Sequence, residues 1–295
     1  MAVVCNIGSL NLDIVYGVPH IVRPGETLAS GGRIVHPGGK GANQSVALAR
    51  AGATVRHCGA VGEDGDLLLA ALVESGVDGS AVLRCPGPSG HAVIQVADDG
   101  ENSIVLHAGA NHAIPVSHIA ASIAALPEDA VVLLQNETCH IATAIDLAQA
   151  RGLAVWFNPA PFTAAVLDLP LDRIAVLVVN QHEAAGLAAS SPTEDPIVLT
   201  AALRQRWPAV TIVLTLGADG VLVDGPDAHH RIAAVAVVPV DTTAAGDTFL
   251  GYCLARRLAG DSWPEAAAIA CHAAALAVTR PGAIPSIPWA QDLIA

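Results

Sequence analysis

Short apolar segments of β type alternate with segments of helical spacing along most of this 295-residue chain. Such alternation favours an α/β fold, in which a doubly wound and mostly parallel sheet is flanked by helices. The length suits one large domain or two ordinary ones, and the continuous rhythm predicts a single domain over residues 1–295. Two stretches, at about 14–36 and 90–107, interrupt this rhythm with short strands and glycine-containing turns. They predict a small lid of β-strands over the main sheet.

Polar or glycine-rich clusters follow nearly every expected strand. The residues that mark these clusters are Asn11 and Asp13, Glu137, Asn158, Asn180 and Glu183, Gly217, and Asp241. In an open parallel sheet the carboxyl ends of the strands share one edge, and ligands bind at that edge. Each cluster alone is typical of an ordinary turn. Six of them on one edge predict a lined cleft.

The stretch from Asp241 to Gly251 places three small residues directly before Asp247. A run of β type at 233–240 precedes it, and apolar residues with helical spacing follow. A strand, a tight turn and a helix start together expose backbone N–H groups, whose partial positive charge holds an anion. A carboxylate beside a bound phosphate suits a base that takes a proton from an attacking hydroxyl. From the spacing alone, Asp247 is equally well explained as a helix cap.

A second glycine-rich stretch, residues 37–44, opens another expected helix and contains Lys40, the one lysine among 14 basic residues. A chain that uses arginine everywhere else indicates a need for a compact ammonium or a flexible stem here. Gln44 stands where the dinucleotide fingerprint requires its third glycine, and Gly41 stands where a P-loop requires Ser or Thr. A nucleotide-binding oxidoreductase and a P-loop enzyme are therefore both disfavoured.

The composition narrows the classes of partner and compartment. A formal net charge of -13 disfavours nucleic acid and anionic membrane as partners. No apolar run reaches the length of a membrane span. Six scattered cysteines without a C-x-x-C pair favour a reducing compartment and disfavour a zinc site. A strand-like segment follows Met1 directly with no basic leader, so we expect a cytoplasmic protein.

Two stretches of the sequence, one early and one late, resemble the two signatures of the ribokinase family, the PfkB-type sugar kinases, and occur in the same order. They are Gly38-Gly39-Lys40-Gly41-Ala42-Asn43-Gln44 and Asp241-Thr-Thr-Ala-Ala-Gly-Asp247-Thr-Phe. The resemblance extends over essentially the whole chain. It implies ATP-dependent phosphorylation of D-ribose to D-ribose 5-phosphate, with Mg²⁺ accompanying ATP and K⁺ as an activating monovalent cation.

The resemblance also implies a role for each matching residue. The sugar would be bound by Asn11, Asp13, Gly39, Lys40, Asn43 and Glu137, with Asp247 as the base. ATP would lie along Asn180, Thr215, Gly217 and Gly220, with an anion hole formed by Ala244, Ala245 and Gly246. Glu183 would organise Mg²⁺ through water. The monovalent cation would be held by Asp241, Thr243, Ala277, Arg280, Gly282 and Ser286.

Some features leave alternatives open. A kinase for nucleosides or for another pentose such as 2-deoxyribose is one, although a pocket with four polar groups favours a small free sugar. A non-catalytic sugar sensor is another, although Asp247 and the glycines are present. The chain departs from the wider family at Ala244, where glycine is usual, and Pro281 lies inside the cation loop. Exposed lid strands commonly pair with a second subunit, so we expect a homodimer through the lid.

Overall fold

The computed structural model describes residues 2–293, except for the side chain of Ala228. Its strands are β1 (Val3–Ile7), β2 (Asn11–Val18), β3 (Gly32–Gly38), β4 (Thr54–Val61), β5 (Asp78–Arg84), β6 (Gly90–Ala97), β7 (Asn102–His107), β8 (Val131–Gln135), β9 (Ala154–Asn158), β10 (Val176–Asn180), β11 (Thr211–Thr215), β12 (Val221–Gly225) and β13 (Ala228–Ile232). Its α-helices are α1 (Lys40–Arg50), α2 (Asp66–Glu74), α3 (Val116–Ala124), α4 (Ile141–Ala150), α5 (Gln181–Ala188), α6 (Pro196–Arg206), α7 (Ala245–Leu258) and α8 (Trp263–Val278). Short 3₁₀ turns include Gly217–Asp219, Ile284–Ser286 and Ala290–Leu293.

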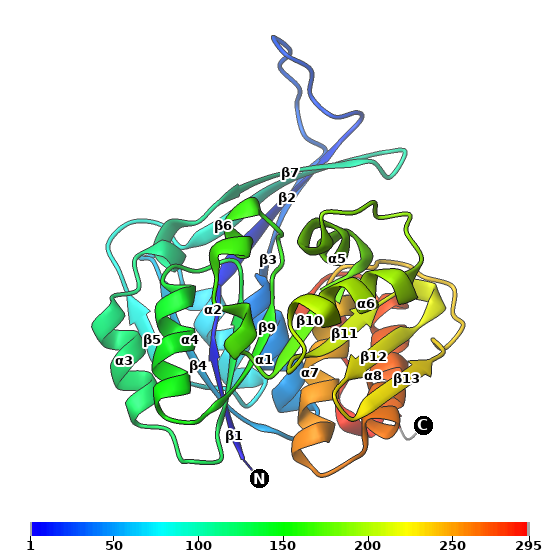
Figure 1. Ribbon diagram of the computed structural model, residues 1–295. Helices are drawn as coiled ribbons and strands as arrows, with labels where there is room; N and C mark the ends of the chain where they lie inside the picture. Colours follow the sequence, from blue (N-terminus) through cyan, green and yellow to red (C-terminus); the bar gives the residue numbers. More distant parts are fainter. Residues whose placement is uncertain (1, 294–295) are drawn as a thin grey trace.

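A large, mostly parallel sheet forms the centre of the molecule (Figure 1). Within residues 2–293 its nine strands follow the order β13-β12-β11-β10-β9-β8-β1-β4-β5. Strands β11 to β5 along this order run parallel, whereas β12 is antiparallel to both of its neighbours. After β1, the chain first adds β4 and β5 on one side of it and later adds β8 and the following strands on the other side. The order of the strands therefore reverses at β1. Ligands bind where the order reverses, and Asn11 and Glu137 follow the two strands concerned, β1 and β8.

Alternate residues of each central strand face two different helix layers. In β8, Val131 and Leu133 join the apolar cluster that includes α1, α2, α7 and α8. Val132 and Leu134 join the cluster that includes α3, α4, α5 and α6. Parallel strands covered on both faces are apolar throughout, which explains why these strands read as continuous runs of Val, Ile and Leu. The predicted α/β fold with helices on both faces of the sheet is confirmed.

A second sheet of four strands, called here the small sheet, lies beyond the carboxyl ends of β1 and β8, at the top of Figure 1. Its order is β3-β2-β6-β7. Its strand β2 begins at Asn11, three residues earlier than the segment expected from residue 14. Asn11 pairs with Gly38 and Gly90, and Asp13 pairs with His36 and Ala92. Asn11 and Asp13 therefore lie on the small sheet itself and not in the polar turn that the sequence suggested.

The strand expected at 233–240 is not formed. The preceding strand, β13, forms the edge of the large sheet, and the chain must return from there to α7, which packs against α1 near the middle. The segment crosses that distance as a loop, anchored at its end where the Val240 N–H donates to the Val278 carbonyl. The valines are consequently exposed, with Val238 at 85%. A β-type composition predicted a strand, but the segment leads from the sheet edge to the start of α7 and forms no ladder with any described strand of either sheet.

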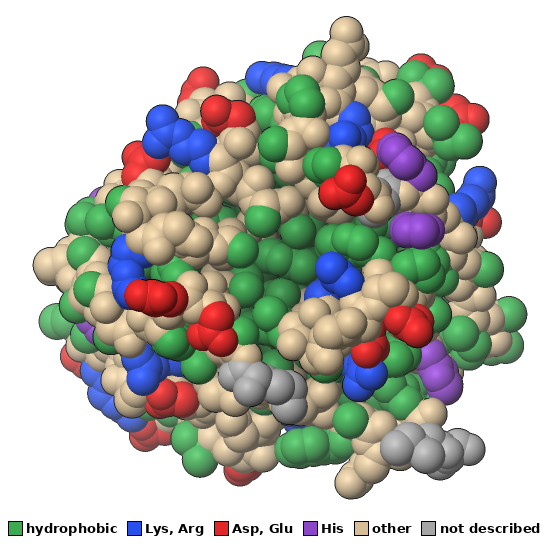
Figure 2. All heavy atoms as spheres, turned by 60° about the horizontal axis from the view of Figure 1, so that its bottom comes forward, with side chains coloured by type: hydrophobic (Ala, Val, Ile, Leu, Met, Phe, Trp, Pro, Cys, Tyr) green, Lys and Arg blue, Asp and Glu red, His purple; other side chains and the backbone are tan. Residues whose placement is uncertain are grey.

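The surface carries acidic and basic side chains side by side. Figure 2 shows one face, on which they surround a central hollow lined by hydrophobic side chains. Among residues 2–293, no helix combines the length and the apolar character that crossing a membrane requires.

Candidate active site

Asp247 lies in the first turn of α7, at the end of the helix where unpaired N–H groups concentrate. The residue before this helix, Ala244, has a φ of 59°, in the left-handed region that favours glycine. This turn is held because Thr248 N–H donates to the Ala244 carbonyl, while Phe249 and Leu250 are buried in the core beneath it. The turn and the helix together place Asp247 near the carboxyl ends of the strands of the large sheet, and only 8% of the residue is exposed.

Both oxygens of the Asp247 carboxylate accept hydrogen bonds from the first turn of α1. Asn43 Nδ2 donates to Oδ2 at 3.0 Å, and Gln44 Nε2 donates to Oδ1 at 2.8 Å. The two helices that carry these residues pack against each other, and a Cβ at Gly251 of α7 would lie 2.4 Å from the Ala47 Cβ of α1. Close packing at this glycine therefore brings the two glycine-rich stretches of the sequence together.

The charges of four carboxylates act on the Lys40 ammonium. The pKa of Lys40 is raised above its ordinary value, chiefly by Asp247 and also by Glu137, Glu183 and Asp13. Burial raises the pKa of Asp13 to about 7, and the negative charges of Glu137 and Asp247 add to this effect. The five groups come from β2, α1, α5, α7 and the loop after β8, so distant segments converge on one charged site.

The side chain of Glu137, in the loop after β8, is held against the start of α1. It accepts a hydrogen bond from Ser9 Oγ at 2.5 Å and another from the Lys40 N–H at 3.1 Å. Burial raises its pKa. Gly41 lies against the backbone after β1, since a Cβ there would be 2.2 Å from Ser9 N. A glycine is required at this position because the helix start approaches that backbone too closely for any side chain.

Asn11 is positioned by two neighbours. Gly39, with a φ of 88°, passes so close that a Cβ would lie 2.9 Å from the Asn11 N atom. On its other side, Asn111 Nδ2 donates to Asn11 Oδ1 at 2.7 Å. Asn111 is itself buried and accepts from the Leu10 N–H at 2.9 Å. The Asn11 side chain is thus held in one orientation at the start of β2.

A cavity of about 510 Å³ opens beside Asp247. It is lined by Lys40, Asn158, Ala160, Val178, Val179, Asn180, Gln181, His182, Glu183, Thr215, Leu216, Gly217, Thr242, Ala244, Ala245, Gly246, Asp247 and Leu250. Of the residues expected to bind sugar, Lys40 and Asp247 line this cavity, whereas Asn11, Asp13, Gly39, Asn43 and Glu137 do not. These five adjoin it through their contacts with the α1 N-terminus and with each other.

A second cavity of about 450 Å³ adjoins the first and shares Thr215, Gly217, Thr242, Ala245 and Gly246 with it. Its other walls are mainly apolar and come from residues 234–239 and from α8, and Gly220 also lines it. A polar cavity at a helix N-terminus continuing into an apolar one suits a ligand with a charged end and a flat apolar end. The structure therefore brings Thr215, Gly217 and Gly220 together with Ala245 and Gly246 along one continuous wall.

Asn180 and Glu183 form the start of α5. The Asn180 side chain accepts from the Glu183 N–H at 2.9 Å, and Glu183 Oε2 accepts from the Asn180 N–H at 3.0 Å. Burial raises the pKa of Glu183. This reciprocal pair is a capping box, which stabilises the helix by itself. It also holds the Glu183 carboxylate in the cavity wall, close enough for its charge to act on Lys40.

The family comparison covers residues 1–290, which match the pfkB family of carbohydrate kinases. The chain belongs to this family. A ribokinase of Haemophilus influenzae is 36% identical over 295 residues, covering 98% of this chain and 96% of that protein. The crystal structure of a ribokinase from Cryptococcus neoformans in complex with ADP has a TM-score of 0.88 at 34% identity, covering 100% of this chain and 99% of that one. An Arabidopsis thaliana ribokinase complexed with ribose and ATP has a TM-score of 0.86 at 29% identity, with coverage of 100% and 98%.

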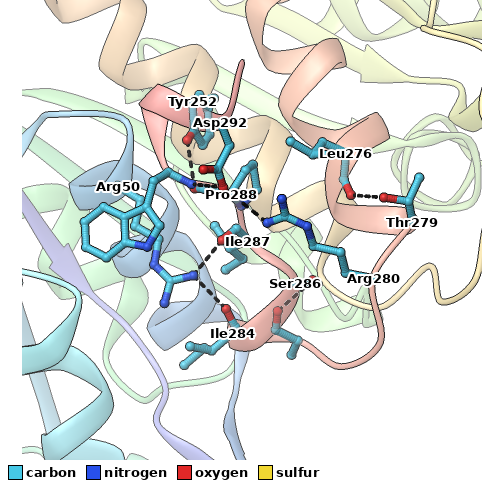
Figure 3. Close-up of polar contacts among 12 residues, drawn as sticks. Arg50, Tyr252, Leu276, Thr279, Arg280, Ile284, Ser286, Ile287, Pro288 and Asp292 are labelled. Atoms are coloured by element: carbon cyan, nitrogen blue, oxygen red, sulfur yellow. Dashed lines mark hydrogen bonds and ion pairs between the residues drawn. The ribbon is translucent and has the colours of Figure 1, made fainter. Parts of the chain in front are cut away.

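The loop expected to bind a monovalent cation in this pfkB-family chain is centred on Asp241. Its Oδ1 accepts from the N–H and the hydroxyl of Thr243, at 2.9 and 2.6 Å, and its Oδ2 accepts from the Gly282 N–H at 2.8 Å. Figure 3 shows the neighbouring segment, in which Arg280 points toward Asp292 and the Ser286 hydroxyl lies near its own turn. Ser286 Oγ donates to the Ala283 carbonyl at 2.8 Å. The Arg280 side chain therefore points to the C-terminal segment, so only its backbone is available to the loop.

Three further residues support the site and were not predicted from the sequence. Gln44 holds Asp247, Ser9 holds Glu137, and Asn111 holds Asn11. Gln44 follows Asn43 in the first signature, and Asn111 follows the second pair of expected lid strands. Nothing in the sequence pattern joins these residues to their partners, which lie 203, 128 and 100 positions away.

Proposed function

We propose that this chain transfers the γ-phosphoryl group of ATP to D-ribose, giving D-ribose 5-phosphate and ADP. The observation that carries the proposal is the hydrogen bond between Asn43 of α1 and Asp247 of α7. It joins the segment that would bind the sugar to the segment that would bind the phosphates. The ribokinases of Haemophilus influenzae and Arabidopsis thaliana, similar over nearly the whole chain, support the same activity.

The sugar would occupy the site between the small sheet and the start of α1. Asn11, Asp13, Asn43 and Glu137 offer amide and carboxylate groups to its hydroxyls, and Lys40 donates beside Gly39. Asp247 then acts as the base for the attacking hydroxyl, because it is the one of the three sugar-site carboxylates that also lines the phosphate cavity. Several fixed polar groups in one buried site favour a small polyol, since each would be left unpaired by an apolar substituent.

ATP would extend through the two adjoining cavities. Its phosphates suit the polar cavity, where the N-terminus of α7 at Ala244, Ala245 and Gly246 favours the charge that develops during transfer. Thr215 and Gly217 line both cavities, and Asn180 lines the polar one. The adenine suits the apolar cavity, which Gly220 helps to line. This arrangement aims the last phosphate at Asp247.

Two cations fit the residues present. The Glu183 carboxylate in the polar cavity suits Mg²⁺ held through water together with the phosphates, since Mg²⁺ keeps several waters and prefers oxygen ligands. Bound there, Mg²⁺ neutralises phosphate charge. The Asp241 carboxylate, the Thr243 hydroxyl and carbonyls near Ala277, Arg280, Gly282 and Ser286 supply the oxygen ligands that K⁺ requires.

The small sheet would act as a lid and as a dimer interface. Ile34, Ile104 and Leu106 are 57%, 53% and 57% exposed. The strand register places all three on the same face as Asp13, through the pairs Val15–Ile34, Ala92–Leu106 and Ile94–Ile104. A second copy of the chain covering this face would bury the three side chains and shield the sugar site from water. A Leu106→Glu variant should then be monomeric in light scattering, and an unchanged dimer would contradict this interface.

The activity is tested by measuring ADP release with a panel of D-ribose, 2-deoxyribose, other pentoses and nucleosides, with and without K⁺. We expect the highest kcat/KM with D-ribose and an increase on addition of K⁺. A higher kcat/KM with a nucleoside or with 2-deoxyribose would replace the proposed acceptor. Sugar binding without any ADP release would indicate a sensor instead of an enzyme.

A further inference from the structure

A chain of three buried side-chain amides leads from the protein interior to Asp247. Gln44 Nε2 donates to Asp247 Oδ1 at 2.8 Å, and Gln44 Oε1 accepts from Gln135 Nε2 at 2.7 Å. Gln135 Nε2 also donates to Asn6 Oδ1 at 2.9 Å, and Asn6 Nδ2 donates to the Gly41 carbonyl at 2.8 Å. All three amide residues are 0% exposed. Water therefore does not compete for these hydrogen bonds.

The hydrogen bonds that link these three amides all run in one direction. A backbone carbonyl only accepts, so the amino group of Asn6 must face Gly41 and its carbonyl oxygen must face Gln135. The amino group of Gln135 is then fixed toward Asn6 and Gln44, which turns the carbonyl oxygen of Gln44 toward Gln135. The amino group of Gln44 is left to face Asp247. Gln44 Nε2 also donates to Asn158 Oδ1 at 3.2 Å, and Asn158 Nδ2 donates to the Val178 carbonyl at 2.9 Å. Two backbone carbonyls, Gly41 through the three amides and Val178 through Asn158, thus determine that Oδ1 of Asp247 receives a hydrogen bond donor.

The other carboxylate oxygen has a less constrained neighbour. Asn43 Nδ2 donates to Asp247 Oδ2, whereas Asn43 Oδ1 is buried and has no hydrogen-bond partner among the described residues. No second contact fixes the direction of this amide. If the Asn43 amide turned by half a rotation, its oxygen would face Asp247 Oδ2 as an acceptor. The Gln44 amide is fixed and cannot present its oxygen to Oδ1 in the same way.

We propose that Asn6, Gln135 and Gln44 act as positioning residues for Asp247, keeping Oδ1 as an acceptor so that Oδ2 receives the proton during phosphoryl transfer. The inference rests on the proposed kinase activity with Asp247 as base. The sugar hydroxyl gives its proton to Oδ2, and its oxygen forms a bond to the γ-phosphorus. The bond from this phosphorus to the β,γ-bridging oxygen breaks, and ADP leaves with the electron pair. The turned Asn43 amide accepts the hydrogen bond from protonated Oδ2 until solvent takes up the proton.

The test compares two substitutions that each remove two buried hydrogen bonds. Gln135→Met keeps a similar volume but interrupts the series of amides, so the Gln44 amide keeps only the longer hydrogen bond to Asn158 as a guide to its direction. Ser45→Ala removes the bonds of Ser45 Oγ to Asn6 Nδ2 and His57 Nδ1, both 2.8 Å long. It leaves the bond from Asn6 to the Gly41 carbonyl in place. The two variants should lose similar thermal stability, whereas only the first should lose the orientation of Asp247.

We expect kcat to fall about tenfold or more in Gln135→Met, with the dissociation constants of ATP and D-ribose changed by less than about twofold. Ser45→Ala should retain the wild-type kcat. Gln135→Glu keeps the shape but cannot donate when ionised, so it should favour the opposite direction of the Gln44 amide against the contact with Asn158 and lower kcat further than Gln135→Met. It also serves as the test if Gln135→Met does not fold.

Equal kcat values in Gln135→Met, Gln135→Glu and Ser45→Ala would overturn the proposal, as would a loss confined to the dissociation constants. Failure of the underlying activity is distinguishable, because the wild-type protein itself would then release no ADP with any sugar.

Discussion

Replacing Asp247 by Asn tests the centre of the site without changing its shape. Oδ1 can still accept from Gln44, and the new amino group takes the place of Oδ2 beside Asn43. Asn43 can turn to receive it, because its Oδ1 has no partner among the described residues. The substitution therefore exchanges two charge-assisted hydrogen bonds for two neutral ones, at a cost of about 1–2 kcal/mol in the free energy of unfolding.

The effect on catalysis should be far larger than the effect on stability. A positioned base contributes on the order of 10²–10⁴ to the rate, so we expect kcat to fall about a thousandfold, which corresponds to about 4 kcal/mol in the activation free energy. The assay couples ADP release to NADH oxidation at saturating D-ribose, and calorimetry with ATP measures nucleotide binding separately. ATP binding should persist, because the α7 N-terminus is intact. A loss of activity under about tenfold would refute the role of Asp247 as the base.

Further predictions concern three residues of the same site. Lys40→Arg should raise the KM for sugar more than the KM for ATP, because a planar guanidinium cannot replace a compact ammonium among four carboxylates; equal changes in both KM values would contradict this. Since the pKa of Asp13 is raised to about 7, its carboxylate is lost as pH falls, so the sugar KM should rise about tenfold from pH 8 to pH 6 and be nearly flat in Asp13→Asn. Because the pKa of Asp13 is higher in the folded state than in the unfolded state, ionisation of this carboxyl group makes the folded state less stable. The contribution of Asp13 to the free energy of unfolding should therefore fall as the pH rises from about 4 to 7. Gly41→Ala should lower the free energy of unfolding by about 1–3 kcal/mol in denaturant titrations, because the new methyl group meets the Ser9 backbone, and an unchanged midpoint would rule out that close approach.

Much of the fold could be predicted from the sequence because its signals are local. Apolar runs of strand length, helical spacing and glycine clusters at their junctions indicated the alternation of strands and helices, and the two expected helix starts, within residues 37–44 and near Asp247, are those of α1 and α7. The same signal misled at 233–240, where a β-type composition lies in a loop. Whether such a segment pairs depends on whether its path runs beside a sheet edge, and no local pattern carries that information.

The sequence by itself determined which chemical groups are available: two glycine-rich helix starts, a single lysine and a set of polar residues after the strands. Only the tertiary structure decided which of these groups meet. Close packing of α1 on α7 brings Asn43 and Gln44 to Asp247, and the reversal of strand order at β1 brings Glu137 to Lys40. The amide chain behind Asp247 was not foreseen, because hydrogen bonds between residues about a hundred or more positions apart depend on how the helices and strands pack and leave no periodic trace in the sequence.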